Sequence, residues 1–172
     1  MQKLASEFHK VLITAKQEKA IVGSLDDIIL NPDTGKVAGI LARVPGRKGK
    51  MAASVSAIQG IGAGFIMIDS AGSLGEQDEI VRIKEILDKE IFILGSKVID
   101  EDGRNLGTVR DYSVNLKVMR LERIYLTSSG FLKILTRDLM IPESDIVKIE
   151  KDKITVRSGR VKSGKKVSAQ IH

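Results

Sequence analysis

The 172-residue sequence contains no cysteine and no tryptophan, and it has only two histidines, three prolines and six aromatic residues. Without cysteine the chain can form no disulfide, no thiolate zinc site and no cysteine nucleophile. His9 and His172 lie near opposite ends of the chain, so a histidine-based metal site or catalytic triad is not expected. We therefore expect a protein with no cofactor, no metal and no enzymatic activity.

Targeting signals are also absent from the sequence. The first ten residues include Glu7 and several polar residues where a secretory leader would need an unbroken apolar core. The longest weakly polar stretch, Ile58 to Ile68, is far shorter than the ~20 residues that span a bilayer. These features predict a cytoplasmic location.

The net charge of +6 is located at the C-terminal end. Between Lys153 and His172 the chain has six basic residues and no acidic residue, whereas residues 1–152 have 22 of each sign. The sequence therefore predicts a neutral folded body with a basic extension.

The sequence repeats itself. A shift of 84 positions places Gly23 and Asp27 on Gly107 and Asp111, and a shift of 88 aligns the later apolar positions of the two copies. The matched order of glycine, acid, turn and apolar residues indicates duplication. The four extra residues are expected in a loop of the second copy.

Each copy has the pattern of short strands and tight turns. Apolar and polar residues alternate in 107–114 and 121–126, as in half-buried strands. The segments 31–35 and 100–103 have the Asn, Asp, Pro and Gly residues of hairpin turns. Short strands with frequent turns predict a mainly β fold of two tandem small β-barrels.

A short helix is predicted between the copies, because Ile80, Ile83 and Leu87 have helical spacing and acidic residues precede them. Its apolar stripe is expected to pack on one of the copies. The predicted divisions of the chain are a first barrel, a linker helix, a second barrel and a flexible basic tail, at residues 1–72, 73–90, 91–158 and 159–172.

The second copy resembles the PRC-barrel family over roughly residues 91–157. The resemblance lies in the segment Leu94 to Val114, with its Asp-Glu-Asp-Gly turn and following Leu-Gly-Thr-Val-Arg-Asp, and in Met140-Ile-Pro-Glu-Ser-Asp-Ile-Val-Lys-Ile. Over residues 5–69 the resemblance is weaker, because Ala53 or Ser54 stands where the second copy has Pro142. The chain is thus similar to a tandem PRC-barrel protein.

The resemblance implies small β-barrels that act through contacts, since no catalytic signature defines the family. Its members include the cytoplasmic domain of the H subunit of photosynthetic reaction centres, which packs on membrane-protein subunits. They also include the C-terminal domain of the ribosome maturation factor RimM, which binds a ribosomal protein.

Two glycine- or acid-rich segments invite ligand-binding interpretations. Gly60-Ile-Gly-Ala-Gly64 could suggest a phosphate loop, but its spacing does not fit a dinucleotide fingerprint, and a hairpin turn is favoured. Asp100 and Asp102 could suggest calcium, but Arg104 occupies the next ligand position and no closing glutamate follows, so a β-turn is again favoured.

Asp27 and Asp111 could form a duplicated functional pair, but no histidine or cysteine joins them. We expect each carboxylate to accept hydrogen bonds from backbone amides of a neighbouring turn. The residues predicted to be structural turn or repeat positions are Gly23, Asp27, Gly35, Gly103, Gly107, Asp111 and Pro142.

Two basic segments are candidates for nucleic-acid or anion contact, namely the loop after Arg43, which ends at Lys50, and the tail. Neither contains an aromatic residue for base stacking, so sequence-specific RNA recognition is not expected. The candidate contact residues are Arg47, Lys48, Arg157, Arg160, Lys162, Lys165 and Lys166.

The favoured functional hypothesis is a non-enzymatic adaptor or scaffold that binds a protein partner through a barrel surface or strand edge. The first alternative is a ribosome-assembly or RNA-associated factor that uses the basic tail. The second is a small-ligand binder in a cleft between the barrels. Peripheral contact with an anionic membrane is less favoured, and a homodimer is compatible with the sequence.

Overall fold

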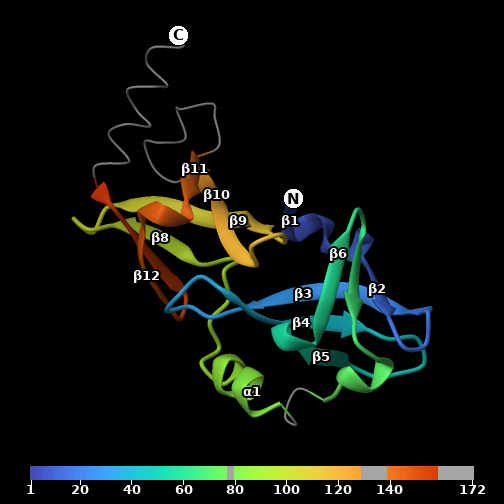
Figure 1. The fold of residues 1–172 in the computed structure, drawn as a ribbon. Helices are drawn as coiled ribbons and strands as arrows, with labels where there is room; N and C mark the ends of the chain where they lie inside the picture. The colour runs from blue at the N-terminus through green and yellow to red at the C-terminus, as the bar shows by residue number, and fades with distance from the viewer. Residues whose placement is uncertain (77–79, 129–138, 159–172) are drawn as a thin grey trace. The chain divides into compact units, whose positions relative to one another are not determined.

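The computed structural model describes residues 1–76, 80–128 and 139–158, and most of them lie in β-strands. Chain contacts divide it into two compact units (Figure 1). Unit 1 consists of Met1–Lys89 together with Val114–Leu121, and unit 2 of Glu90–Ser113 with Glu122–His172. The mainly β fold with two sheets confirms the predicted fold class at this level.

The first sheet has six strands in the order β5-β4-β3-β2-β7-β6. Neighbouring strands are antiparallel except β2 and β7, which are parallel. Its strands are β2 (Leu12–Ala15), β3 (Ala20–Leu30), β4 (Val37–Arg43), β5 (Lys50–Ser54), β6 (Ile58–Gly62) and β7 (Phe65–Ile68). The remaining short elements of this part are β1 (Gln2–Leu4) and the 3-10 helices η1 (Ala5–Lys10), η2 (Val55–Ala57) and η3 (Ala71–Ser73).

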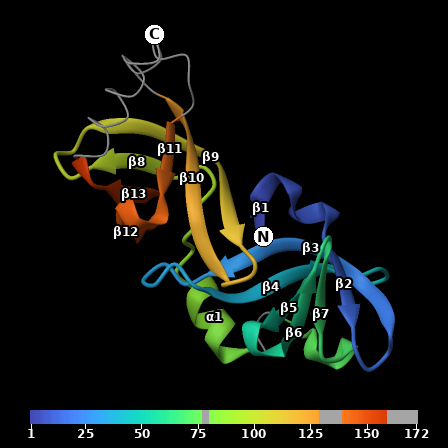
Figure 2. The ribbon, with the colours of Figure 1, turned by 45° about the horizontal axis from the view of Figure 1, so that its top comes forward.

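The second sheet follows the order β11-β10-β9-β8-β13-β12 (Figure 2). Its parallel pair is β8 with β13. The strands are β8 (Lys97–Asp100), β9 (Asn105–Asn115), β10 (Arg120–Ser128), β11 (Leu139–Pro142), β12 (Ile146–Glu150) and β13 (Lys153–Val156), with the 3-10 helix η6 (Glu143–Asp145) before β12.

The six strands of the first sheet and the six in the main order of the second follow the same topology, which confirms that the fold is a tandem one; β1 pairs with β9 in addition. Ser54 ends β5 and precedes η2, as Pro142 ends β11 and precedes η6. Ser54 is therefore the position that matches Pro142. The register change from 84 to 88 falls between Thr127 and Pro142, where the second copy has four more residues than the first copy has between Arg43 and Ser54.

A glycine in each copy allows two strands to approach closely. A Cβ atom on Gly23 would lie 2.4 Å from the Arg43 carbonyl oxygen, and one on Gly107 would lie 2.0 Å from the Thr127 carbonyl oxygen. Gly107 also has a φ of +139°, which side-chain-bearing residues rarely adopt. These two repeat positions lie inside β3 and β9 rather than in turns.

Gly35 and Gly103 do lie in turns, with φ values of +68° and +82°. The Gly103 amide donates to the Asp100 carbonyl at 3.0 Å, and the Gly35 amide donates to the Asn31 carbonyl at 2.9 Å. Left-handed backbone at these points is the conformation for which glycine is suited.

The helix α1 (Val81–Leu87) packs its apolar side on the first copy, as predicted. Ile83 is 1% exposed and lies against Ile29, Leu41 and Ala52. The helix is shorter than the 73–90 segment because Gly75 exchanges two backbone hydrogen bonds with Ala52 and is therefore extended. Across the described ranges, no helix has the length and apolar character needed to cross a membrane.

The turn between β9 and β10 belongs to unit 1. Within that unit the Leu121 amide donates to the Gly35 carbonyl at 2.8 Å, and the Val37 amide donates to the Met119 carbonyl at 2.9 Å. The Leu116 amide likewise donates to the Met1 carbonyl at 3.0 Å. Unit 1 is therefore built from two stretches of sequence that are not adjacent in the chain.

Candidate functional site

The basic loop between β4 and β5 is partly neutralised by an acidic residue of β3. The Asp26 carboxylate accepts from Arg43 Nε at 2.5 Å and lies 2.6 Å from Lys50 Nζ. The Asp26 side chain is only 9% exposed, whereas Arg47 and Lys48 at the loop tip are exposed. Two of the four cations in this segment are thus held in ion pairs.

These contacts determine the charge state of Asp26. Burial raises the pKa of a carboxyl group, but hydrogen bonds and charge attraction from Lys50 and Arg43 outweigh burial and hold the Asp26 pKa below its ordinary value. The carboxylate therefore stays ionised at neutral pH and fixes the ends of the loop.

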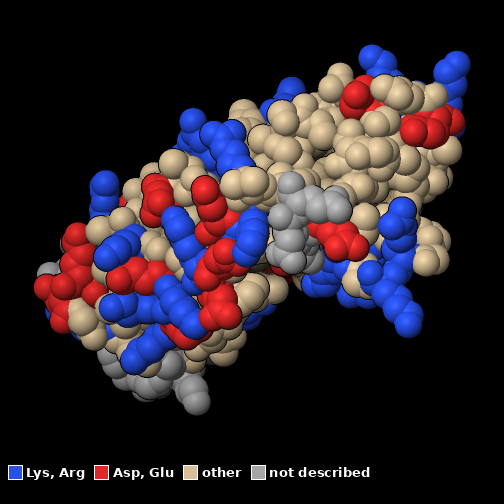
Figure 3. All heavy atoms as spheres, turned by 90° about the horizontal axis from the view of Figure 1, so that it is seen from below, with Lys and Arg blue, Asp and Glu red and all other residues tan. Residues whose placement is uncertain are grey.

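The predicted nucleic-acid residues of the tail are only partly described. Arg157 follows β13 with an exposed side chain, and its amide donates to the Asp145 carbonyl at 3.0 Å. The tail residues predicted to make such contacts that lie outside the described residues are Arg160, Lys162, Lys165 and Lys166. On the face drawn in Figure 3, basic and acidic side chains are largely interspersed.

Asp27 and Asp111 have equivalent structural contacts in the two copies. Each Oδ1 accepts a hydrogen bond from the amide of the next residue, at 2.8 Å from Ile28 and 2.9 Å from Tyr112. These two amides belong to the same strands as the carboxylates. The Asp27 contact coincides with a shift in the β3–β4 register after Leu25.

The segment 100–103 forms a tight turn stabilised by its first residue. Asp100 Oδ1 accepts from the amides of Asp102 and Arg104, both at 2.9 Å. These two hydrogen bonds satisfy backbone amides of the turn, so Asp100 Oδ1 is engaged within the chain. Over residues 1–76, 80–128 and 139–158 there is no group of three or more metal-ligating side chains.

Gly60 to Gly64 form the hairpin between β6 and β7, as the spacing predicts. Gly62 pairs with Phe65, and Gly64 has a φ of +86° in the turn. The segment therefore does not precede a helix, which a phosphate-binding glycine loop would need.

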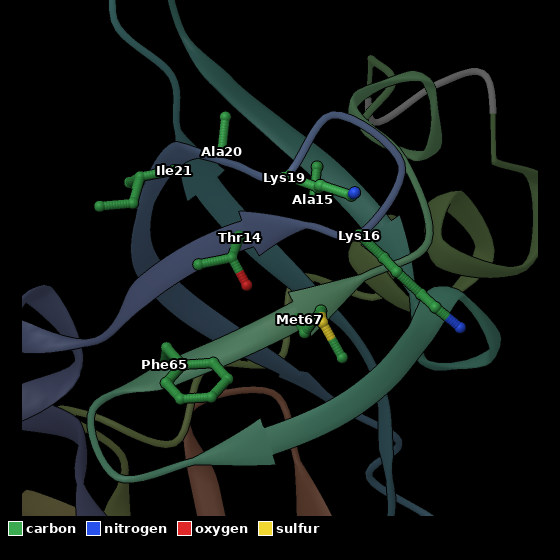
Figure 4. Close-up of a pocket in the computed structure, with 8 residues that line it drawn as sticks. All are labelled: Thr14, Ala15, Lys16, Lys19, Ala20, Ile21, Phe65 and Met67. Carbon is green, nitrogen blue, oxygen red and sulfur yellow. The ribbon is translucent and has the colours of Figure 1, made fainter.

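An apolar groove lies on the outer face of the first sheet. We call the surface formed by its lining residues the apolar face. The groove has a volume of about 390 Å³ (Figure 4). Ile21 is 63% exposed and Phe65 is 38% exposed, although both are large and apolar. The residues that line the groove are Thr14, Ala15, Lys16, Lys19, Ala20, Ile21, Phe65 and Met67.

The shape of the apolar face follows from side-chain size on three neighbouring strands. Ile21 of β3 stands on one side and Phe65 and Met67 of β7 on the other, while β2 contributes the small residue Thr14 between them (Figure 4). Thr14 pairs with Ile21 on one side and with Met67 on the other, and this short side chain between two tall ones produces the groove.

Two lysines lie at one end of the groove, in the β2–β3 turn. Both Lys16 and Lys19 are exposed. Glu18 lies between them in sequence, but both of its carboxylate oxygens are 3.1 Å from the Ala71 amide. The turn thus has two lysines and one acid, which gives this end of the groove a net positive charge.

Glycines in β6 allow the β7 side chains to lie flat. A Cβ on Gly62 would be 2.1 Å from Phe65 Cε1, and a Cβ on Gly60 would be 3.3 Å from Met67 Cε. The aromatic ring and the methionine tip therefore occupy the space that side chains on β6 would fill. These glycines shape the apolar face.

The second copy has charged residues at the matching positions. Glu150 pairs across β12 and β13 with Lys153, where the first copy pairs Gly62 with Phe65. Lys148 Nζ lies 3.0 Å and Lys153 Nζ 3.4 Å from the Glu150 carboxylate. At these matching positions the second sheet therefore presents paired charges instead of large apolar side chains.

The apolar face was not predicted from the sequence, although β7 contains a signal for it. Its residues Phe-Ile-Met-Ile are apolar on both sides of the strand, whereas the matching β13 sequence Lys-Ile-Thr-Val alternates. A strand that is apolar on both faces needs a cover on both faces. The inner face supplies one cover, and the outer face has none among the described residues.

Comparison with known proteins identifies one family. Residues 93–162 match the model of the PRC-barrel domain. The chain therefore contains a PRC-barrel domain, which confirms the resemblance seen in the second copy. A search of curated proteins found no match to the chain.

Proposed function

We propose that the protein is a non-enzymatic, cytoplasmic adaptor or scaffold that binds a protein partner through the apolar face. The observation that carries this proposal is the exposure of large apolar side chains in a groove, beside two lysines, on an otherwise well-packed sheet. Contiguous exposed apolar surface is typical of interaction sites in soluble proteins.

The comparison between the two copies supports a functional origin for this surface. The same strand pairing in unit 2 carries an ion-pair network of lysines and Glu150, so the topology does not require apolar residues there. Large apolar side chains on an outer face lower solubility, so the contrast with the charged residues of the second copy supports a binding role for them.

The chemistry of the groove favours binding over catalysis. Its lining has one hydroxyl, on Thr14, and the two lysine amines, with no carboxylate or imidazole among the residues that line it. General acid–base catalysis needs a second titratable group within hydrogen-bond reach of the reacting atom. A protein surface with large apolar side chains needs no such group.

A direct test places a photo-crosslinking amino acid at position 21 and, as a control, at position 97 of the full-length chain in cells that naturally contain it. Ile21 lies on the apolar face, and Lys97 is an exposed residue of the second sheet. We expect a defined protein to be crosslinked from position 21 and not from position 97. Crosslinking to RNA alone, or identical products from both positions, would contradict the proposal.

A further inference from the structure

We propose that the occupant of the apolar face is an acidic amphipathic helix of the partner. Its apolar side chains would lie between Ile21 and the pair Phe65 and Met67, and its carboxylates would lie at Lys16 and Lys19. This inference rests on the proposed function, and it names the kind of segment that the groove accepts.

The backbone of the groove excludes an added strand. The strands β3, β2 and β7 are neighbours inside the sheet order, and each is hydrogen-bonded on both sides. An extended peptide placed over them would find no sheet edge to satisfy its own amides and carbonyls. A helix satisfies its backbone internally and needs only side-chain contacts.

The width of the groove fits a helix. Neighbouring strands lie ~4.8 Å apart, so the outer two of three strands are ~10 Å apart. An α-helix with its side chains is ~10–12 Å wide, so its body would rest across the two banks and only its apolar side chains would enter the groove. With Ile21 on one bank, Phe65 and Met67 on the other, and Thr14 between them, one helix can place its apolar stripe in the groove.

The charge at the end of the groove selects an acidic partner. Lys16 and Lys19 are both exposed there, and they outnumber the one carboxylate of the turn, that of Glu18, which accepts from the Ala71 amide. A basic segment would bring like charges together, whereas carboxylates on the helix would pair with the two amines.

A protein helix fits this surface better than an anionic membrane does. Apolar contact with lipid requires side chains that project outward into the bilayer boundary. Here the short Thr14 side chain leaves a hollow, and the Phe65 ring and the Met67 tip lie over Gly62 and Gly60. The hollow accepts side chains from an occupant.

The test uses three fluorescein-labelled 18-residue peptides with the same helical leucine stripe and the full-length chain. The first has glutamate and glutamine on its polar face, the second has lysine and glutamine, and the third is the acidic peptide with two central prolines. Fluorescence anisotropy measures binding at low salt. We expect the acidic helix to bind about tenfold or more tightly than the basic helix and the proline peptide.

Variants locate the binding. Phe65→Lys with Met67→Thr, the residues of the second copy, should abolish binding, and Lys16→Glu with Lys19→Glu should reverse the preference between acidic and basic peptides. The matched control, Lys97→Glu with Lys117→Glu, changes two exposed lysines that are not among the residues lining the groove and should leave binding unchanged. Circular dichroism of each variant verifies folding.

The outcomes separate this inference from the proposed function. Equal binding of the acidic and basic helices, or undiminished binding of the proline peptide, would overturn it while crosslinking from position 21 still supported an adaptor. Binding to vesicles with 30% phosphatidylserine in place of the peptides would assign the face to a membrane. Self-association that Phe65→Lys with Met67→Thr removes would assign it to a second copy.

Discussion

The two sheets share a topology and differ on their outer faces. Where β6 and β7 pair Gly62 with Phe65, β12 and β13 pair Glu150 with Lys153. The next residues of β7 and β13, Ile66 and Ile154, are apolar and fully buried in both copies. The inner residues therefore specify the fold, and the outer residues can change without changing it.

The largest difference in stability should come from the duplicated glycine. Gly107→Ala should lower the free energy of unfolding by more than about 4 kcal/mol, because the new Cβ meets the Thr127 carbonyl and the backbone is in a region disfavoured for alanine. In Gly23→Ala the new Cβ would clash with the Arg43 carbonyl. The φ of Gly23 is not positive, so alanine adds no backbone strain there. Urea unfolding of both variants checks the order, and a larger loss for Gly23→Ala would contradict it.

Next in size is the helix that packs on the first copy. Ile83→Ala should cost about 2–4 kcal/mol by leaving a cavity against Ile29, Leu41 and Ala52. Amide hydrogen exchange should accelerate in β3 to β5 of unit 1, and strands β8 to β13 should be much less affected. Val81→Ala, at an exposed position of the same helix, is the control and should change stability by less than about 0.5 kcal/mol.

Transfer of the outer-face residues of the second copy to the first should change stability less. It should, however, abolish binding of the acidic helical peptide. The exchange is Gly60→Lys, Gly62→Glu, Phe65→Lys and Met67→Thr. Replacing Phe65 removes the ring that a Cβ at position 62 would meet, so the variant should unfold within about 1 kcal/mol of the wild type. Calorimetry checks stability, and a dye that binds exposed apolar surface checks the face. Undiminished dye binding would show that the groove does not carry the exposed apolar surface.

The smallest effect concerns Asp26, where the second copy has Arg110, whose guanidinium lies 5.8 Å from the Tyr125 ring centre. Because the Asp26 pKa is lowered on folding, its ion pairs stabilise the protein above the unfolded pKa of ~3.9, and this contribution is lost as pH falls through the lower folded pKa. Asp26→Asn should therefore cost less than about 1 kcal/mol at pH 7, since both cations are largely exposed.

The pH dependence provides the measurement for this last prediction. The difference in unfolding free energy between wild type and Asp26→Asn should be constant from pH 8 to about pH 5 and vanish at strongly acidic pH. Urea titrations across this range test it. A difference that grows as the pH falls would mean that the carboxylate is destabilised by folding.

The sequence predicted the features that depend on local chemistry. Repeat spacing, strand alternation and the turns at Gly35 and Gly103 were readable because each depends on a few neighbouring residues. The pairing of Asp26 with Arg43 and Lys50 was not predicted, since it requires β3, β4 and β5 to be brought side by side. The apolar face was missed for the same reason, because exposure of an outward residue depends on what packs over it.

The division of unit 1 between two stretches of chain has a consequence for its synthesis. The Gly35 carbonyl accepts from the Leu121 amide and the Val37 amide donates to the Met119 carbonyl, so these partners are synthesised only after the first strands of the second copy have been translated. Until these partners are synthesised, the Gly35 carbonyl and the Val37 amide can bond only to water. A fragment that ends at Lys89 is fixed in this incomplete state, which makes the full-length chain the right object for refolding studies.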